Sequence, residues 1–355
     1  MRTNIDTILN NNQNALNAIP WDKLTNAWIG EGFALGLTNM PDYRARPAIF
    51  LGKMLYLQAI VESDSGDGSK AVANLRRGLA LFHTFRSAVL VHHLIRRTGE
   101  SLCCQVLERV MSRVEISADD LTALEHLLSD DHRDGFREAF MEIRCRNIYG
   151  MTLVPSLPNS AWAVSNAFES KMEAGLKTQI FATYFRLSGK MYSNTDFLEM
   201  LDVRSAQIAA LKLPPKERFA EFTRLKNQVA SQGTPTYMSQ FNGAALDLSR
   251  QLQSDAEVLA KLQISRVALE VERWRLAHGG RAPDSLAELV PDFAPSIPLD
   301  PFDNQPLRYK KLARGFLVYS IGADFTDDGG KEKTGDKASD DSDSDHYDIT
   351  FSVER

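Results

Sequence analysis

The acid-rich segment near the end of the chain constrains its fold more than any other feature. Ten carboxylates lie between Asp324 and Asp348, against only three lysines, and glycine turns such as 327–330 interrupt them. Ionised carboxylates repel one another, so they either stay apart in solvent or are drawn together by a cation. Ca²⁺ binds carboxylate and carbonyl oxygens in flexible loops. The segment therefore predicts a small module closed by Ca²⁺, with a solvated acidic loop as the alternative.

Length and charge exclude some classes of protein. The chain has 355 residues, of which 43% are hydrophobic and 25% charged, which allows two or three globular domains. The net charge of −5 comes from the acidic segment, whose surplus of seven negative charges leaves the remainder near +2. No nucleic-acid surface is indicated. Neither a membrane helix nor a signal peptide is visible, so we expect a soluble chain.

Helical periodicity dominates the chain from about residue 25 to residue 253. Apolar residues recur at helical spacing, and glycine, proline and capping residues separate the repeats. The prolines at 154–158 indicate a break near 151–160. The pairing of helices resembles that of tetratricopeptide-type repeats, but no 34-residue self-similarity is present. Predicted helices cover about 47–63, 69–82, 86–112, 117–128, 161–186, 195–211 and 215–231.

The last hundred residues predict a different kind of structure. A long helix over about 254–278 ends at Gly279 and Gly280, and a short helix begun by Asp284 follows at 285–290. Aromatic and β-branched residues then alternate in three segments, which predicts strands at 307–310, 316–320 and 349–353. The predicted class is mainly α: an irregular helical bundle or short solenoid in 1–253, then a small α+β domain with an antiparallel sheet in 254–355.

Several motifs in this second part resemble, in the same order, the globular part of a type II secretion major pseudopilin. The motifs are Ala-Leu-Glu-Val-Glu-Arg-Trp at 268–274, Gly-Arg-Ala-Pro at 280–283, Pro-Leu-Asp-Pro-Phe at 298–302, Leu-Arg-Tyr at 307–309, Tyr-Ser-Ile-Gly-Ala-Asp at 319–324 and Asp-Ile at 348–349. The resemblance implies a pseudopilin-like fold, with a spine helix that packs against the sheet.

The same resemblance implies a set of calcium ligands. They are backbone carbonyls near Ile321 and Ala323 and the carboxylates of Asp324 and Asp348. Relative to the family pattern, residues 336–345 look inserted, so the second carboxylate stays open among Asp327, Asp328 and Asp348. Asp324 remains a predicted ligand whichever of these three supplies the second carboxylate.

One departure from the family bears on function. Pseudopilins begin with a processed leader and a hydrophobic helix, whereas here a helical region of about two hundred residues precedes the spine helix. The arrangement resembles a group of uncharacterised bacterial cell-envelope proteins, often anchored in the membrane at the N terminus, although no anchor is visible here. The resemblance implies the periplasmic side of the envelope, and the sequence leaves a cytoplasmic location open.

Histidines are the first candidates for catalysis. His92 and His93, with His83 nearby, could supply metal ligands or a general base. Neighbouring residues on a helix point about 100° apart, so His92 and His93 are poorly placed to bind one small ion. Packing inside the bundle is therefore the favoured interpretation. The three cysteines, Cys103, Cys104 and Cys145, form no disulfide framework and are expected to be buried.

Charged residues give a second set of candidates. Helical ion pairs on a solvated face are expected for Glu100, Glu108, Arg96, Arg97 and Arg109. A polar groove is conceivable around Glu138, Glu142, Arg144 and Arg146. No phosphate loop, nucleophile elbow or zinc motif is present.

Two functions from different classes follow. The first is a non-enzymatic envelope or secretion-associated protein that binds a protein partner or assembles with itself, with a calcium-stabilised C-terminal module. The alternative is a hydrolase whose site lies in the helical groove around His92, Glu100, Glu138 and Arg144.

Overall fold

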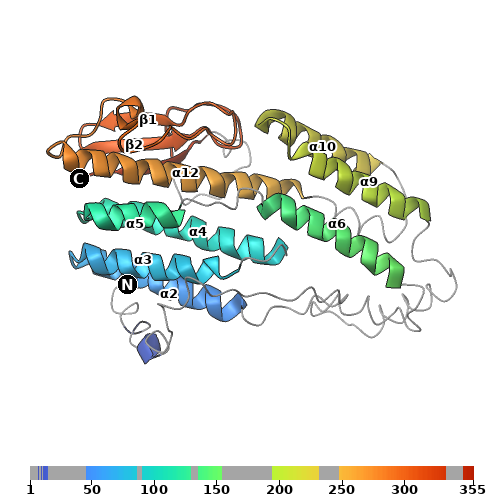
Figure 1. Ribbon diagram of the computed structural model, residues 1–355, viewed down its shortest axis with the longest axis horizontal. Coiled ribbons are helices and arrows are strands. Elements are labelled where there is room, and N and C mark those ends of the chain that lie inside the picture. Colours follow the sequence, from blue (N-terminus) through green and yellow to red (C-terminus); the bar gives the residue numbers. More distant parts are fainter. Residues whose placement is uncertain are drawn as a thin grey trace, which may run out of the picture.

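The protein is described by a computed structural model over residues 7, 9, 11–14, 45–85, 90–128, 135–153, 194–231, 248–332 and 347–355. Within these residues it is mainly helical and carries a small three-stranded antiparallel sheet, as the sequence predicts. The predicted helix at 161–186 and the inserted residues 336–345 lie outside the described residues. The molecule is elongated, and one long helix, α12, runs beneath the sheet (Figure 1).

Four helices stack on the side of α12 that faces away from the sheet (Figure 1). They are α2 (Ala45–Asp64), α3 (Gly68–His83), α4 (Leu90–Met111) and α5 (Ala118–Leu128). The side chain of Asp67 caps α3 by accepting a hydrogen bond from the N–H of Lys70 at 3.0 Å. The observed bounds lie within four residues of the predicted ones.

Two glycines allow α2, α3 and α4 to pack closely around one aromatic ring. Phe82 of α3 is fully buried, and a Cβ atom added to Gly99 of α4 would lie 2.0 Å from its Cγ. A Cβ added to Gly52 of α2 would lie 2.3 Å from the ring's Cε2. Gly99 therefore makes room for Phe82, while α4 continues through it without a break.

Replacing Gly99 with alanine is expected to destabilise the fold despite alanine's better helix propensity. The propensity gain is about 1 kcal/mol, whereas overpacking a core costs about 1–3 kcal/mol, so a net loss of up to about 2 kcal/mol is expected in urea unfolding. Replacing Phe82 with leucine in the same chain should recover part of that loss. A Gly99→Ala variant more stable than the natural chain would show that the ring is not confined.

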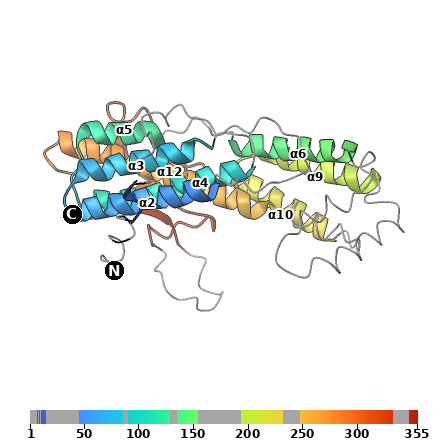
Figure 2. The same ribbon diagram turned by 90° about the horizontal axis from the view of Figure 1, so that it is seen from below.

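A second group of helices lies at the other end of the molecule (Figure 2). It consists of α6 (Gly135–Leu153), α9 (Asn194–Ala210) and α10 (Pro215–Ser231). Phe136, Phe140 and Phe222 form its core together with Leu252 near the start of α12. The rings of Phe136 and Phe140 lie 4.8 Å apart between centroids, and those of Phe140 and Phe222 5.8 Å apart. Helix α6 extends to residue 153, and the rest of the break expected near 151–160 lies outside the described residues.

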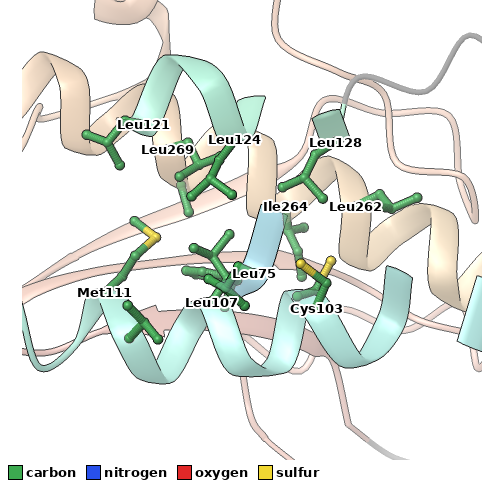
Figure 3. Close-up of a cluster of buried hydrophobic side chains, with 14 of the residues drawn as sticks. Leu75, Cys103, Leu107, Met111, Leu121, Leu124, Leu128, Leu262, Ile264 and Leu269 are labelled. Atoms are coloured by element: carbon green, nitrogen blue, oxygen red, sulfur yellow. The ribbon is translucent and has the colours of Figure 1, made fainter. Parts of the chain in front are cut away.

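The long helix α12 (Ser249–Ala277) joins the two groups of helices and the sheet. Its 29 residues span about 44 Å. Figure 3 shows Leu124 of α5 pointing toward Leu269 of α12, with Leu107 of α4 below them. One hydrophobic cluster extends from α2 through α12 to the sheet. The division predicted at 253/254 lies inside α12, and the cores on both sides of it include residues of this helix.

The sheet consists of β1 (Arg308–Leu312), β2 (Gly315–Ser320) and β3 (Ile349–Val353), all antiparallel with β2 in the centre. Phe316 and Val318 of β2 are fully buried and share the main core with Phe351 and Val353 of β3. Because side chains alternate along a strand, these residues form the face toward α12. The three strands agree with the prediction to within two residues.

The acidic loop, the chain between β2 and β3, contacts the other face of the sheet at Gly330. Gly330 has φ +79°, and a Cβ atom there would lie 2.4 Å from Cδ2 of Leu317 and 3.3 Å from Cδ1 of Tyr319. The Nζ of Lys310 lies 5.7 Å from the centroid of the Tyr319 ring. The loop is therefore packed onto β2, and Gly330 supplies the close approach.

The 3-10 helix η4 (Leu286–Leu289) follows α12 and takes Ser285 as its N-cap, one residue later than the predicted Asp284. Cys103 and Cys104 are buried as expected, whereas Cys145 on α6 is exposed, which corrects the third prediction. None of the helices in the described ranges is both long enough and apolar enough to cross a bilayer.

Candidate functional site

The carboxylate of Asp348 holds the two ends of the acidic loop together. Its Oδ2 accepts a hydrogen bond from the N–H of Gly330 at 2.5 Å, and its Oδ1 accepts one from the N–H of Asp328 at 3.4 Å. The N–H of Asp348 donates to the carbonyl of Lys331 at 3.0 Å. The turn after β2 is thus tied to the residue that precedes β3.

Asp324 and Asp327 shape the turns between these two points. Asp324 Oδ1 accepts from the N–H of Thr326 at 3.0 Å, and Asp327 Oδ1 accepts from the N–H of Gly329 at 2.9 Å. Both are the side-chain turns that aspartate commonly forms. Asp327 Oδ2 also lies 3.7 Å from Nε of Arg308, so its charge is partly neutralised within the protein.

Asp328 and Asp348 carry charge that the described residues do not neutralise. Asp328 Oδ2 is buried and has no hydrogen-bond partner within the described ranges. Burial raises the pKa of Asp348, the charges of Asp327 and Asp328 raise it further, and the N–H bonds from Gly330 and Asp328 oppose the rise. A divalent cation would supply an electrophile for Asp328 and relieve the repulsion.

The predicted calcium ligands do not all lie in the same place. Ala323, Asp324 and Asp348 line one cleft of about 860 Å³ between the loop, α4 and α12, while Ile321 is buried in an apolar cluster. No set of three His, Cys, Asp or Glu side chains in the described ranges is arranged to hold a metal. An ion at this loop would therefore also need carbonyl or water oxygens, which Ca²⁺ accepts.

The cleft beside the loop is acidic. Five carboxylates line it, those of Glu108, Glu257, Asp324, Glu332 and Asp348, and Lys261 is the one cation among its described lining residues. Burial raises the pKa of Glu108 to about 7, while the N–H of Ser352, which donates to Glu108 at 2.6 Å, opposes that rise. The electrostatic potential of the cleft thus favours a cation.

The proline-flanked Asp300 is buried at the centre of a hydrogen-bond network, whereas in the sequence it stood out only as part of the 298–302 motif. Its Oδ1 accepts hydrogen bonds from the N–H of Phe302 and the hydroxyl of Ser320, both at 2.9 Å. Its Oδ2 accepts from the N–H of Ile321 at 3.0 Å and from Nη1 of Arg308 at 2.8 Å. Phe302 is fully buried. Asp300 thereby joins the 298–302 turn to β1 and to the end of β2.

The predicted solvated face of α4 is wrong for three of its residues. Arg96, Arg97 and Glu100 are 4%, 4% and 1% exposed. Glu100 Oε2 lies 2.9 Å from Nη1 of Arg97, and its Oε1 lies 3.3 Å from Nε of Arg96 and 3.2 Å from Nε2 of His83. These residues face α3 and α12, where the charges neutralise one another inside the bundle. Burial alone would raise the pKa of Glu100, but His83, Arg97 and Arg96 lower it to about 2.

The network continues onto α12 through Asp255, a residue that the sequence did not single out. Asp255 Oδ1 accepts from Nε2 of His93 at 2.7 Å and from Nε of Arg97 at 2.9 Å. Burial opposes ionisation of Asp255, yet the bond from His93 and the charge of Arg97 lower its pKa. Because 158 residues separate Arg97 from Asp255, no local pattern signals their pairing.

The residues of the predicted hydrolase site have structural partners of their own. The ring of His92 packs edge-on against Phe85, with centroids 5.4 Å apart. Glu138 is exposed on α6, and Nε of Arg144 donates to the hydroxyl of Ser205 at 3.1 Å. No contact in the described ranges joins these groups to Glu100 as a catalytic set.

Comparisons of the chain with protein families, with curated proteins and with solved structures found no match. The likeness to pseudopilins therefore stays a prediction that rests on the sequence motifs.

Proposed function

We propose that this chain is a non-enzymatic binding or structural protein whose C-terminal module is stabilised by Ca²⁺. The observation that carries the proposal is the carboxylate pair in the acidic loop. Asp348 ties the loop ends together with a raised pKa, and Asp328 Oδ2 is buried with no hydrogen-bond partner in the described ranges. Hard oxygen ligands on a turn-rich loop suit Ca²⁺.

In this proposal the ion acts on the shape of the module. The loop packs on the outer face of β2, so fixing it would hold that face and the adjoining cleft rigid. Asp324, which lines the cleft, and Asp328, which has the buried oxygen, are the proposed carboxylate ligands, and carbonyl or water oxygens would complete the shell. Asp327 is the weaker candidate because Arg308 already lies beside it.

The pseudopilin resemblance supports a location and a kind of partner. We place the protein on the periplasmic side of a bacterial envelope, in a secretion-associated role. Its helices would bind a protein partner or another copy of the chain, and the calcium-stabilised module would serve as a rigid recognition element. No contact identified for His92, Glu138 or Arg144 in the described ranges favours the hydrolase over this function.

Adding Ca²⁺ is expected to raise the melting temperature of the full chain, and adding a chelator to lower it. A ligand present at 100 times its Kd stabilises the folded state by about 2.7 kcal/mol, which corresponds to a shift of about 4 °C for a chain of this size. The shift should shrink as the pH falls toward 4, because protons compete with Ca²⁺ for carboxylates. Thermal unfolding monitored by circular dichroism measures both effects.

Matched variants show which residues cause the Ca²⁺-induced shift in melting temperature. Asp324→Ala and Asp328→Asn should each abolish the Ca²⁺ shift, whereas Asp292→Ala, which removes an exposed carboxylate outside the loop, should leave it unchanged. Mg²⁺, which demands a tighter octahedral shell, should replace Ca²⁺ poorly. A melting temperature that ignores Ca²⁺ in the natural chain, or a shift that survives in both loop variants, would refute the site.

A further inference from the structure

A second cavity, separate from the acidic cleft, lies where the two groups of helices meet the C-terminal module. This groove of about 700 Å³ is bounded by the start of α6, the turn between α9 and α10, one side of α12 and residues 296–301. None of its described lining residues also lines the acidic cleft. Grooves of this size at the junction of several elements commonly take small ligands. We propose that it binds a small organic carboxylate with an apolar body.

Cationic groups of the groove supply the first argument. Arg137 lines the groove from α6, and its Nε is a buried donor that has no acceptor in the described ranges. A buried donor without an acceptor lowers the stability of the folded state, and a ligand that supplies an acceptor removes this cost. Lys212 lies exposed at the rim. An anion in the groove would accept from Arg137, whose planar fork matches a carboxylate.

The two carboxylates of the groove do not cancel these charges. Asp255 is held by His93 and Arg97, and Asp300 by Arg308 and backbone N–H groups. Both acids are thus neutralised from inside the protein, which leaves the cations of the groove in excess.

Arg218 adds a third positive charge to the same wall. Its Nε and Nη2 donate to the carbonyl of Leu213, at 3.3 Å and 3.0 Å, and this acceptor is neutral. Burial lowers the pKa of Arg218, and the charge of Asp255 opposes that shift. The groove as a whole therefore favours an anion, in contrast to the acidic cleft.

Apolar walls and one unused acceptor define the rest of the ligand. Leu252, Leu259, Ile297 and Pro301 line the groove beside the cations. Oε1 of Gln263 is a buried acceptor without a hydrogen-bond partner in the described ranges. The chemistry that fits is a carboxylate on an apolar chain that also carries an N–H or O–H donor for Gln263.

N-octanoylglycine and its methyl ester provide a matched pair of probes, because they differ in the charge of the carboxyl group. In isothermal titration calorimetry of the full chain, the acid should bind saturably with one molecule per chain, and the ester about tenfold more weakly. Arg137→Gln should reduce the affinity for the acid about tenfold and leave that for the ester nearly unchanged, because only the acid forms the charged hydrogen bond. Arg76→Gln, which removes an exposed arginine on α3, should change neither.

Lys212→Gln removes another positive charge of the groove without disturbing a buried residue. It should weaken binding of the acid about twofold, as expected for a rim charge, and keep the melting temperature of the natural chain. Equal affinity for the acid and the ester would overturn the proposal. So would binding that Arg137→Gln leaves unchanged, or that Arg76→Gln weakens as much as Arg137→Gln does.

Discussion

Replacing Asp300 with alanine is expected to lower the free energy of unfolding by about 3–5 kcal/mol, the usual cost of breaking a buried ion pair. The side chain is fully buried, and its loss leaves Arg308 and the N–H groups of Phe302 and Ile321 without their acceptor. Those donors hold the 298–302 turn against the sheet. Urea unfolding followed by circular dichroism measures the change.

A matched exposed aspartate separates this effect from the loss of a charge. Asp292→Ala should change stability by no more than about 0.5 kcal/mol, because that side chain is exposed. Asp300→Asn keeps the shape but loses the charge facing Arg308, so it should lie between the two. An Asp300→Ala chain as stable as the Asp292→Ala chain would show that the hydrogen-bond network around Asp300 contributes nothing.

Replacing Glu100 with glutamine is expected to destabilise the bundle by about 3 kcal/mol at pH 7. Glutamine has the shape of a protonated carboxyl group, so the loss corresponds to the pKa of Glu100, which falls from 4.5 to about 2 on folding. Each unit of pKa corresponds to about 1.4 kcal/mol. Arg96 and Arg97 would keep their burial but lose their counter-charge.

The lowered pKa of Glu100 also determines how its contribution to stability depends on pH. A carboxyl group whose pKa is lowered on folding stabilises the native state above its unfolded pKa, and this contribution is lost as the pH falls through the folded value. The difference between the natural chain and Glu100→Gln should thus be constant above pH 4.5 and shrink toward pH 2.

Glu217→Gln on the exposed face of α10 serves as the control, and it should show no such change between pH 4.5 and pH 2. A stability difference between the natural chain and Glu100→Gln that is small at pH 7, or that grows on acidification, would contradict the assignment.

Local patterns determined the secondary structure of the described parts. Alternating aromatic and β-branched residues located all three strands, and Gly279 follows the end of α12 closely. These signals are local because backbone hydrogen bonding, capping and side-chain alternation act over a few residues.

Gly99 shows where local reasoning fails. Glycine has a low helix propensity, and only the contact with Phe82, seventeen positions earlier, explains why a glycine stands inside α4. The prediction of a solvated face on α4 is wrong for a related reason. Helical spacing shows that Arg96, Arg97 and Glu100 share a face, but it does not show whether that face meets water or another helix.

The sequence by itself determined the helices, the strands and the acidic composition of the loop, because each depends on neighbours along the chain. Only the tertiary structure decided which charges are buried together, since Asp255 reaches Arg97 across 158 residues and Arg308 meets Asp300 from another element. The groove beside Arg137 arises in the same way, from four segments that only the packing of α12 brings together. Burial of a charge depends on its partners, and those partners are distant in sequence.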